Sequence, residues 1–336
     1  MRVLVTGGGG FVGNAIVNRL GARGWKVASF SRGFYPDLES QNVEQIQGDL
    51  ADREAVRKAC QGRDAVVHVA ARAGIWGRHR DFHQTNVEGT KNVIEACRSE
   101  RIDRLVYTSS PSVVMDGADQ NGIDEAAPYP DRYLASYPET KAQAERLILA
   151  AADRRLGTVS LRPHLIWGPG DRHLLPKILE RARSGRLRQV GPGRNRVDFT
   201  YIDDVARAHL LALDRLRPGA SISGKAYFIS QDDPVSLWGF INRVLQAIGS
   251  SPVQRRISPT AAYALGTVCE TVYRCFGIRH DPPMTRFLAR SLATAHWFRI
   301  DAAKRELGYR PETSINEGLK HFANWWLQQG KGGKAQ

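Results

Sequence analysis

A glycine-rich segment restricts what this chain can fold into more than any other part of its sequence. It follows a short strand-like run, opens an amphipathic stretch over residues 11–23, and reads Thr6-Gly7-Gly8-Gly9-Gly10-Phe11-Val12-Gly13. Between a strand and a helix, Gly7 permits the tight turn, Gly10 lets the backbone approach a pyrophosphate, and Gly13 lets the helix pack on the sheet. The free N–H groups at the helix N-terminus then face the phosphates. The segment predicts a dinucleotide-binding βαβ unit whose cofactor contacts come from Thr6, Gly7, Gly10, Phe11, Val12 and Gly13.

Strand-like and helix-like segments alternate along the first half of the chain. The alternation predicts an α/β fold of Rossmann type with a doubly wound parallel sheet. Further strands are predicted over 26–31, 43–47, 65–70, 104–109 and 158–162, and helices over 52–60, 86–100 and 137–153.

After residue 163 the pattern loosens and turn signals become frequent. Helices are predicted near 174–184, 203–216, 236–248, 259–276, 301–307 and 315–328, between short strands near 187–190, 196–202 and 225–229. We therefore expect a Rossmann domain over 1–163 that binds NADP, with later strands and helices returning to it from about 196–230. A smaller α+β substrate-binding lobe is expected mainly over 164–329, and a disordered tail over 330–336.

Composition excludes several classes of protein. The 336 residues include 48 Lys and Arg against 34 Asp and Glu, a net charge of +14, but the basic residues are spread out, so no nucleic-acid partner is expected. The four cysteines form no C-x-x-C pair, which predicts neither a metal site nor a disulfide framework. The N-terminus lacks a signal peptide and no apolar run is long enough to cross a membrane, so we expect a cytoplasmic protein.

The end of the second strand bears on the choice of cofactor. Enzymes that use NAD usually place an acid there, whereas this chain has Ser31 and Arg32. Because an arginine pairs with a 2′-phosphate, we expect NADP(H) to be preferred over NAD; the alternative is that Arg32 is a solvated loop residue. Asp49, after the third strand, either reaches the adenine ring or caps the 52–60 helix.

Tyr137 and Lys141 are candidates for acid–base chemistry. They lie four residues apart on one predicted helix face, and Ser136 and Glu139 have the spacing of a capping box at its start. A lysine ammonium beside a phenol lowers the pKa of the tyrosine toward neutrality, so that Tyr137 can exchange a proton with a substrate oxygen. A serine hydroxyl at the end of the preceding strand can polarise the same oxygen, and Ser109, Ser110 and Ser112 all compete for this role.

Taken together, these motifs resemble the extended short-chain dehydrogenases/reductases over nearly the whole chain. The resemblance rests on Thr6–Gly13, His68–Ala71, Asn86–Thr90, Thr108–Ser110, Tyr137–Lys141, Leu161–Pro163 and Asp198–Val205. It implies that Tyr137 is the general acid/base, that Lys141 binds the nicotinamide ribose, that Ser110 orients the substrate carbonyl, and that Asn86 supports the site. It also implies cofactor contacts from Ser31, Arg32, Asp49, Leu50, Ala70, Ala71 and Pro163.

The second lobe is similar to the 3β-hydroxysteroid dehydrogenase-like branch of that family. This similarity is carried by residues 165–171, 225–230, 283–287, 295–298 and 306–309, and segment 70–77 is most similar to bacterial reductases of long-chain olefin biosynthesis. The resemblance implies NADPH-dependent reduction of a long-chain acid, a 2-alkyl-3-oxoalkanoate. Its carboxylate needs a cation, for which Arg72 is the first candidate, ahead of Arg78, His79 and Arg80; His164 is a weaker candidate for substrate contact. A sterol-4-carboxylate 3-dehydrogenase, a nucleotide-sugar epimerase or dehydratase, and a non-catalytic NADP sensor remain alternatives.

One apolar stripe lies outside the predicted nucleotide-binding sheet. Between 259 and 276 only Glu270 and Arg274 are charged, and the stripe at helical spacing consists of Ala261, Leu265, Val268, Val272 and Phe276. It predicts either a core or subunit-contact helix, or a lid over the alkyl chains that touches a membrane or a partner enzyme when open. We also expect a homodimer.

Overall fold

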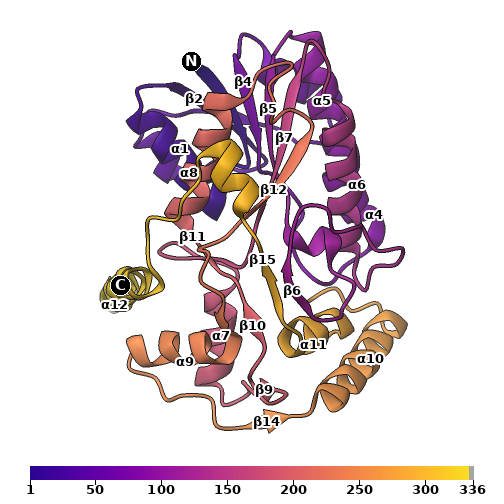
Figure 1. Ribbon diagram of the computed structural model, residues 1–336, viewed down its shortest axis with the longest axis vertical. Helices are drawn as coiled ribbons and strands as arrows, with labels where there is room; N and C mark the ends of the chain where they lie inside the picture. Colours follow the sequence, from indigo (N-terminus) through magenta and orange to yellow (C-terminus); the bar gives the residue numbers. More distant parts are fainter. Residues whose placement is uncertain (333–336) are drawn as a thin grey trace.

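A parallel sheet of seven strands forms the centre of the computed structural model, which describes residues 1–332 (Figure 1). The strand order is β12-β7-β5-β4-β1-β2-β3, so the chain starts in the middle and winds outward in both directions. The strands are β1 (Arg2–Thr6), β2 (Lys26–Ser31), β3 (Glu44–Gln47), β4 (Ala65–His68), β5 (Arg104–Thr108), β7 (Gly157–Pro163) and β12 (Lys225–Ile229). The structure confirms the predicted Rossmann-type fold, including the return of 225–229 to this sheet.

Helices cover both faces of this sheet (Figure 1). Strand residues alternate between the faces, so Val3 and Val5 pack under one layer and Leu4 under the other. The first layer holds α1 (Phe11–Ala22) and α8 (Ile202–Arg215), and the second holds α3 (Arg53–Cys60), α5 (Gly89–Ser99) and α6 (Ser136–Ala150). Because both faces are covered, the central strands β1 and β4 are mostly apolar and buried, whereas the edge strand β3 is polar.

The second lobe lies below the sheet in Figure 1 and has its own aromatic core. Phe199 and Phe240 stack with ring centroids 3.8 Å apart, and the buried Trp167 meets Phe240 edge-on. Its helices are α7 (Leu175–Arg183), α9 (Leu237–Ala247), α10 (Pro259–Cys275), α11 (Arg286–Ala293) and α12 (Ile315–Gly332). Its strands are β6 (Gln120–Ile123), β8 (Ile166–Trp167), β9 (Gln189–Val190), β10 (Arg196–Val197), β11 (Thr200–Tyr201), β13 (Val235–Ser236), β14 (Arg256–Ile257) and β15 (His296–Phe298).

Several short elements were not predicted because they depend on distant partners. Strand β6 exists only because it pairs with β15, some 170 residues later, so the first half of the chain contributes to the smaller sheet. The predicted 86–100 helix begins instead as a π-helical turn over Gln84–Glu88 and continues as α5. Other unpredicted elements are the short strands β8, β13, β14 and β15 and the helical segments α2 (Pro36–Glu39), α4 (His79–His83), a 3₁₀ turn over Pro111–Val114, and α11.

Two local predictions were wrong, and one of the two alternatives for Asp49 is excluded. Asp52, not Asp49, caps α3, because its Oδ1 accepts hydrogen bonds from the N–H groups of Glu54 and Ala55; Asp49 instead closes a turn onto the N–H of Ala51. Helix α6 begins at Ser136 with no side-chain cap, so the capping box is absent. The tail was expected to be disordered from 330, but α12 extends to Gly332 with glutamine and lysine, both good helix formers, in its last turns. Residues 333–336 of that predicted tail lie outside the described residues.

Candidate active site

The glycine loop forms a cradle that side chains would fill. Gly7 has φ +72°, and a Cβ there would lie 3.0 Å from the backbone of Ala70. A Cβ on Gly13 would lie 2.1 Å from the carbonyl oxygen of Gly7, so this helix start requires glycine. No side chain caps α1, which leaves its N-terminus open to an anionic group. Loop and helix therefore fit the pyrophosphate of a dinucleotide.

Hydrogen bonds fix the neighbouring loop after β4. The hydroxyl of Thr6 accepts from the N–H groups of Val69 and Ala70, each at 3.1 Å, and it also bonds Nδ1 of His68 at 2.7 Å. Burial lowers the pKa of His68 to about 3, so this imidazole is neutral. A neutral, fully bonded histidine is a structural anchor for the loop that carries Ala70 and Ala71, the residues expected to contact the cofactor.

The other predicted cofactor residues lie along the same edge of the sheet. Ser31 and Arg32 end β2, where Ser31 is half-buried and Arg32 is exposed. Leu50 is buried against α5, and Pro163 ends β7. The structure adds one residue that sequence reasoning missed: the ring of Tyr35 covers the glycine loop, and a Cβ on Gly9 would lie 2.2 Å from it.

Lys141 is buried beneath the sheet edge with its ammonium group held in place. Its Nζ donates to the carbonyl of Thr108 at 2.6 Å and lies 4.1 Å from the ring centroid of Tyr107. Burial lowers the pKa of Lys141 to about 7, and the nearby Glu145 carboxylate partly opposes this. At neutral pH, Lys141 is therefore present in both its charged and its neutral form.

The structure corrects the expected state of Tyr137. Burial raises the pKa of the phenol, and only a hydrogen bond with Ser110 acts in the opposite direction. The predicted lowering by Lys141 does not occur, because the lysine is directed to Thr108 and is itself partly neutral. Tyr137 is therefore protonated at neutral pH, the state in which it can donate a proton.

The three candidate serines differ in accessibility: Ser110 is half-buried, whereas Ser109 and Ser112 are buried. Ser110 precedes the 3₁₀ turn, and its Oγ accepts from the N–H of Ser112 at 3.2 Å and bonds the Ser112 hydroxyl at 2.9 Å. Ser110 also acts on Tyr137, because its hydroxyl lowers the pKa of the phenol against the larger effect of burial. Ser109 is buried, and its hydroxyl has no hydrogen-bond partner among the described residues.

Asn86 links the loop after β4, which carries Arg72, to the helix that carries Tyr137. Its Oδ1 accepts from the N–H of Arg72 at 2.7 Å, and its Nδ2 donates to the carbonyl of Arg72 and to the Thr140 hydroxyl. Asn86 lies in the π-helical turn, a rare conformation that is frequent at functional sites. Its hydrogen bonds therefore hold the Arg72 backbone against α6, as the expected supporting role requires.

A buried ion pair under the site was not predicted. Glu145 follows Lys141 by one helical turn and is fully buried; its carboxylate accepts from Nε and Nη2 of Arg162, from Ser160 at 2.6 Å and from Tyr129 at 2.7 Å. Burial raises the pKa of Glu145, but Arg162 and Ser160 outweigh it, so the pKa lies below its usual value. The ion pair therefore keeps the Glu145 carboxylate ionised and fixed one helical turn from Lys141.

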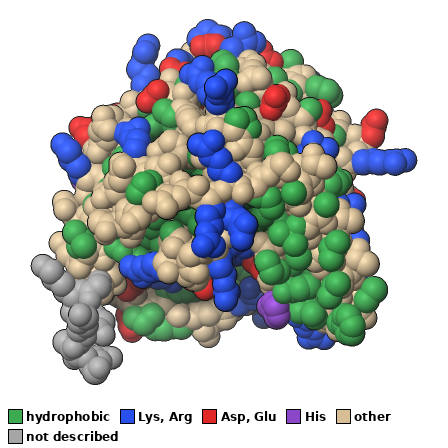
Figure 2. Space-filling model, turned by 90° about the horizontal axis from the view of Figure 1, so that it is seen from below, with side chains coloured by type: hydrophobic (Ala, Val, Ile, Leu, Met, Phe, Trp, Pro, Cys, Tyr) green, Lys and Arg blue, Asp and Glu red, His purple; other side chains and the backbone are tan. Residues whose placement is uncertain are grey.

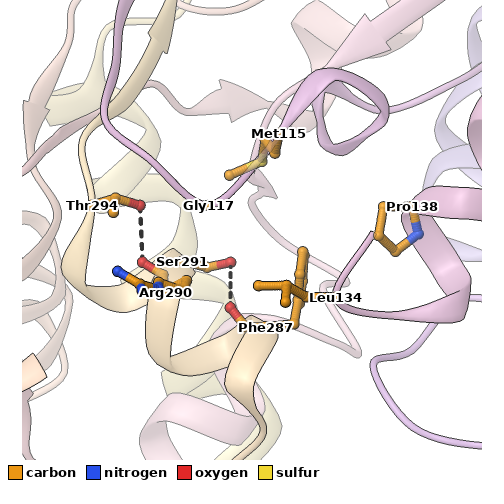
Figure 3. Close-up of a pocket in the computed structure, with 8 residues that line it drawn as sticks. All are labelled: Met115, Gly117, Leu134, Pro138, Phe287, Arg290, Ser291 and Thr294. Carbon is orange, nitrogen blue, oxygen red and sulfur yellow. Dashed lines mark hydrogen bonds between the residues drawn. The ribbon is translucent and has the colours of Figure 1, made fainter. Parts of the chain in front are cut away.

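A cavity beside Tyr137 has mostly apolar walls (Figure 3). Pro138, the neighbour of Tyr137, forms one side, and Figure 3 shows Met115, Leu134 and Phe287 around the opening. The cavity itself is small, about 10 Å³ in volume, which is room for about one water molecule. One cation, Arg290 on α11, contributes to the wall. Sequence reasoning missed this pocket because its walls come from three distant segments.

The two predicted substrate residues outside this cavity differ in accessibility. Arg72 is exposed, 3.7 Å from the Asp81 carboxylate and 5.1 Å from the ring centroid of Phe82. His164 is only 5% exposed; its Nε2 contacts Nδ1 of His296 at 3.2 Å, and it packs edge-on against Phe298. Burial lowers the pKa of His164, so it is neutral. The expectation of substrate contact is not supported for His164, which is packed inside the fold.

Comparison with known proteins agrees with the fold. The 3-beta hydroxysteroid dehydrogenase/isomerase family model matches residues 4–258. The chain is 50% identical to a 2-alkyl-3-oxoalkanoate reductase of Stenotrophomonas maltophilia, over 96% of this chain and 98% of the relative. It is 32% identical to a decarboxylating sterol-4-alpha-carboxylate 3-dehydrogenase of Mus musculus, over 94% and 88%. Among solved structures, MoeE5 in complex with UDP-glucose and NAD superposes with a TM-score of 0.76 at 25% identity, over 98% and 99%.

These matches define the class of enzyme. The protein is an oxidoreductase of the short-chain dehydrogenase/reductase type that acts on CH–OH groups and uses a nicotinamide cofactor. Within that class, the chain belongs to the 3-beta hydroxysteroid dehydrogenase/isomerase family.

Proposed function

We propose that this enzyme is an NADPH-dependent reductase that converts a 2-alkyl-3-oxoalkanoate to the 2-alkyl-3-hydroxyalkanoate. The observation that carries the proposal is the 50% identity, over 96% of this chain, to a relative named 2-alkyl-3-oxoalkanoate reductase. The walls of the small cavity at Pro138 support the same substrate class, because apolar walls suit alkyl chains and Arg290 suits a carboxylate.

The chain's own residues supply proton transfer and orientation. Tyr137, protonated at neutral pH, donates its proton to the 3-oxygen, and Ser110 holds that oxygen by a second hydrogen bond. Asn86 keeps the Arg72 loop in register with α6. Arg72 and Arg290 are the two candidate partners for the substrate carboxylate. The bound nicotinamide supplies the hydride to C3.

The preference for NADPH rests on the end of β2. Arg32 is exposed there, and the chain lacks the acid that would accept hydrogen bonds from the ribose hydroxyls and repel a 2′-phosphate. The MoeE5 structure contains NAD, which supports a shared nicotinamide site, and we assign the choice between NADP and NAD in this chain to Arg32.

A sterol-4-carboxylate is the second candidate substrate. Its dehydrogenase is 32% identical to this chain, and a sterol acid combines a bulky apolar body with a carboxylate, as the cavity requires. A nucleotide sugar is less well supported, because MoeE5, whose structure contains UDP-glucose, is 25% identical to this chain.

Oxidation of candidate alcohols tests the substrate and the cofactor together. Racemic long-chain 2-alkyl-3-hydroxy acids, sterol carboxylates and UDP-sugars are each incubated with NADP⁺ or NAD⁺, because the corresponding β-keto acids decarboxylate readily. We expect formation of reduced cofactor with the 2-alkyl-3-hydroxy acids and NADP⁺. Activity on a sterol or a sugar alone would refute the proposed substrate.

The same assay with Arg32→Asp isolates the cofactor preference. We expect this variant to lose about 1–3 kcal/mol of NADP⁺ binding, or roughly 5- to 150-fold in kcat/KM, and to gain relative activity with NAD⁺. Arg19→Asp, on α1 of the same domain, is the matched control for charge. A wild-type enzyme that already prefers NAD⁺ would contradict the preference.

A further inference from the structure

The loop after β4 links the Rossmann domain to the second lobe. It continues from Ala71 and Arg72 through residues 73–78, which we call the strap, and enters α4 at His79. Helix α4 packs on α6, and in Figure 1 both lie on the right of the molecule with α10 of the second lobe below them. The strap is therefore placed next to the helix that carries Tyr137.

Both ends of the strap are tied to the start of α6. Before the strap, the N–H of Arg72 donates to Asn86, whose Nδ2 donates to the hydroxyl of Thr140 at 3.0 Å. After the strap, Nε2 of His79 lies 3.5 Å from the carboxylate of Glu139. Both partners on α6 lie within one helical turn of the candidate proton donor. The strap thus begins and ends beside the site of the proposed chemistry.

The backbone of the strap is weakly held between these two ends. Among residues 1–332, residues 73–77 make no hydrogen bond from their backbone to another backbone group. Gly74 and Gly77 have φ +122° and +141°, values that residues with a side chain rarely adopt. These two glycines stand on either side of Trp76, so the strap can bend before and after this residue.

Trp76 docks the middle of the strap on the second lobe. The side chain is half-buried; its Nε1 donates to the carbonyl of Ile278 at 3.0 Å, and its ring meets Tyr273 edge-on with centroids 6.0 Å apart. The guanidinium carbon of Arg274 lies 5.6 Å from the centre of the same ring. Each of these contacts is weak by itself, so Trp76 can leave its place without unfolding the surrounding structure.

The surface that receives Trp76 is fixed within the second lobe. A Cβ on Gly266 of α10 would lie 2.6 Å from the backbone of Thr285, so the helix and the segment that leads into α11 are in close contact. The buried carboxylate of Glu270 accepts from the N–H of Arg286 at 2.7 Å and from its Nε at 2.9 Å. Because α10 is held in this way, the strap is the more mobile of the two partners.

The apolar stripe of α10 lies on the outside of the molecule. Its members Leu265, Val268, Val272 and Phe276 are between 41% and 78% exposed, and Figure 2 shows hydrophobic side chains gathered on the right, the side on which α10 lies in Figure 1. The prediction of a core helix is therefore wrong for this stripe. The cavity of Figure 3 is lined from α11 instead. None of the described helices, α10 included, is long and apolar enough to cross a membrane.

The small size of the cavity at Pro138 means that part of the chain moves when substrate binds. The cavity has room for about one water molecule, whereas the proposed substrate carries two alkyl chains, and to this extent the inference rests on the proposed function. The strap is the segment best suited to move, because it is weakly held, has a glycine on each side of its anchor and adjoins the start of α6.

We propose that Trp76 is a positioning residue of this enzyme. When its ring is docked on Tyr273, the strap is closed beside Tyr137, excludes water during hydride transfer and holds the Arg72 loop toward the substrate. When the ring leaves, the strap swings outward on its two glycines, and substrate enters or product departs. Binding of the nicotinamide cofactor does not depend on the strap, because the glycine loop lies on β1 and α1.

Limited digestion with trypsin tests the strap in the ligand-free, full-length enzyme. The bond measured is the one after Arg78, an exposed residue at the end of the strap. We expect Trp76→Ala to be cut there about tenfold faster than the wild type, and Trp76→Phe, which keeps a ring but loses the hydrogen bond, about fivefold faster. Trp297→Ala is the matched control, because Nε1 of Trp297 donates to Asn121 at 3.1 Å and Arg196 lies over its ring, on β15.

Kinetics with NADP⁺ and the alcohol that the enzyme oxidises give a second readout. We expect Trp76→Ala to raise KM and to lower kcat/KM by about tenfold, with an unchanged Kd for NADP⁺ and an unchanged melting temperature. Trp76→Ala that matches Trp297→Ala in both experiments would overturn the proposal. Parallel losses of NADP⁺ affinity, melting temperature and kcat/KM would also overturn it, because they would assign Trp76 to the stability of the fold. Digestion requires no substrate, so its result is distinguishable from failure of the proposed reaction.

Discussion

Tyr137→Phe is expected to lower turnover by about 10²–10⁴-fold while leaving the fold and nicotinamide binding intact. Burial keeps the phenol protonated at neutral pH, so its removal takes away the proposed proton donor. Steady-state kinetics and fluorescence titration with NADPH separate the two effects.

Tyr133→Phe is the matched control for this variant. Tyr133 lies four residues before Tyr137, and its hydroxyl donates to the carbonyl of Val113 at 2.8 Å. It takes no part in the proposed chemistry. We expect this control to retain most of its activity. Near-wild-type rates for Tyr137→Phe would mean that the proton comes from another group.

Arg162→Met is expected to destabilise the protein by about 3–5 kcal/mol, because it leaves the carboxylate of Glu145 buried without its cation. Restoring neutrality with Glu145→Gln in the same chain should recover part of that loss. Arg53→Met breaks the exposed pair with Glu95 and should have an effect of at most about 1 kcal/mol. Urea unfolding followed by circular dichroism ranks the three variants, and equal midpoints for Arg162→Met and Arg53→Met would show that the buried pair contributes little.

The same pair gives a pH dependence whose sign follows from the pKa of Glu145. Its folded-state pKa lies below the usual value, so its contribution to the free energy of unfolding is present at neutral pH. That contribution is lost as the pH falls through the folded-state pKa. The difference in free energy of unfolding between the wild type and the Arg162→Met, Glu145→Gln double variant should therefore become smaller at acidic pH.

Local pattern was sufficient to predict the nucleotide-binding part of the molecule. The glycine loop, the alternating strands and the spacing of Tyr137 and Lys141 each depend on neighbours within a few residues, where periodicity and steric rules apply. The apolar stripe on α10 was visible for the same reason, but whether it faces a core or solvent depends on what packs against it.

Long-range packing decided what the sequence left open. The cavity walls combine Met115, Pro138 and Phe287, which no local pattern connects. Burial, rather than sequence proximity, sets the pKa values: Lys141 and Tyr137 are four residues apart, yet desolvation moves both toward their neutral forms. Histidine is a residue type common in active sites, but His164 packs between His296 and Phe298.

Isotope transfer tests the proposed reaction most directly. A long-chain 2-alkyl-3-hydroxy acid with deuterium at C3 is incubated with the enzyme and NADP⁺, and the reduced cofactor is isolated for mass spectrometry. The proposed function predicts that the NADPH carries one deuterium, because the hydride leaves C3 of the acid. Unlabelled cofactor, or no reduction while a C3-deuterated sterol carboxylate transfers its label, would contradict it.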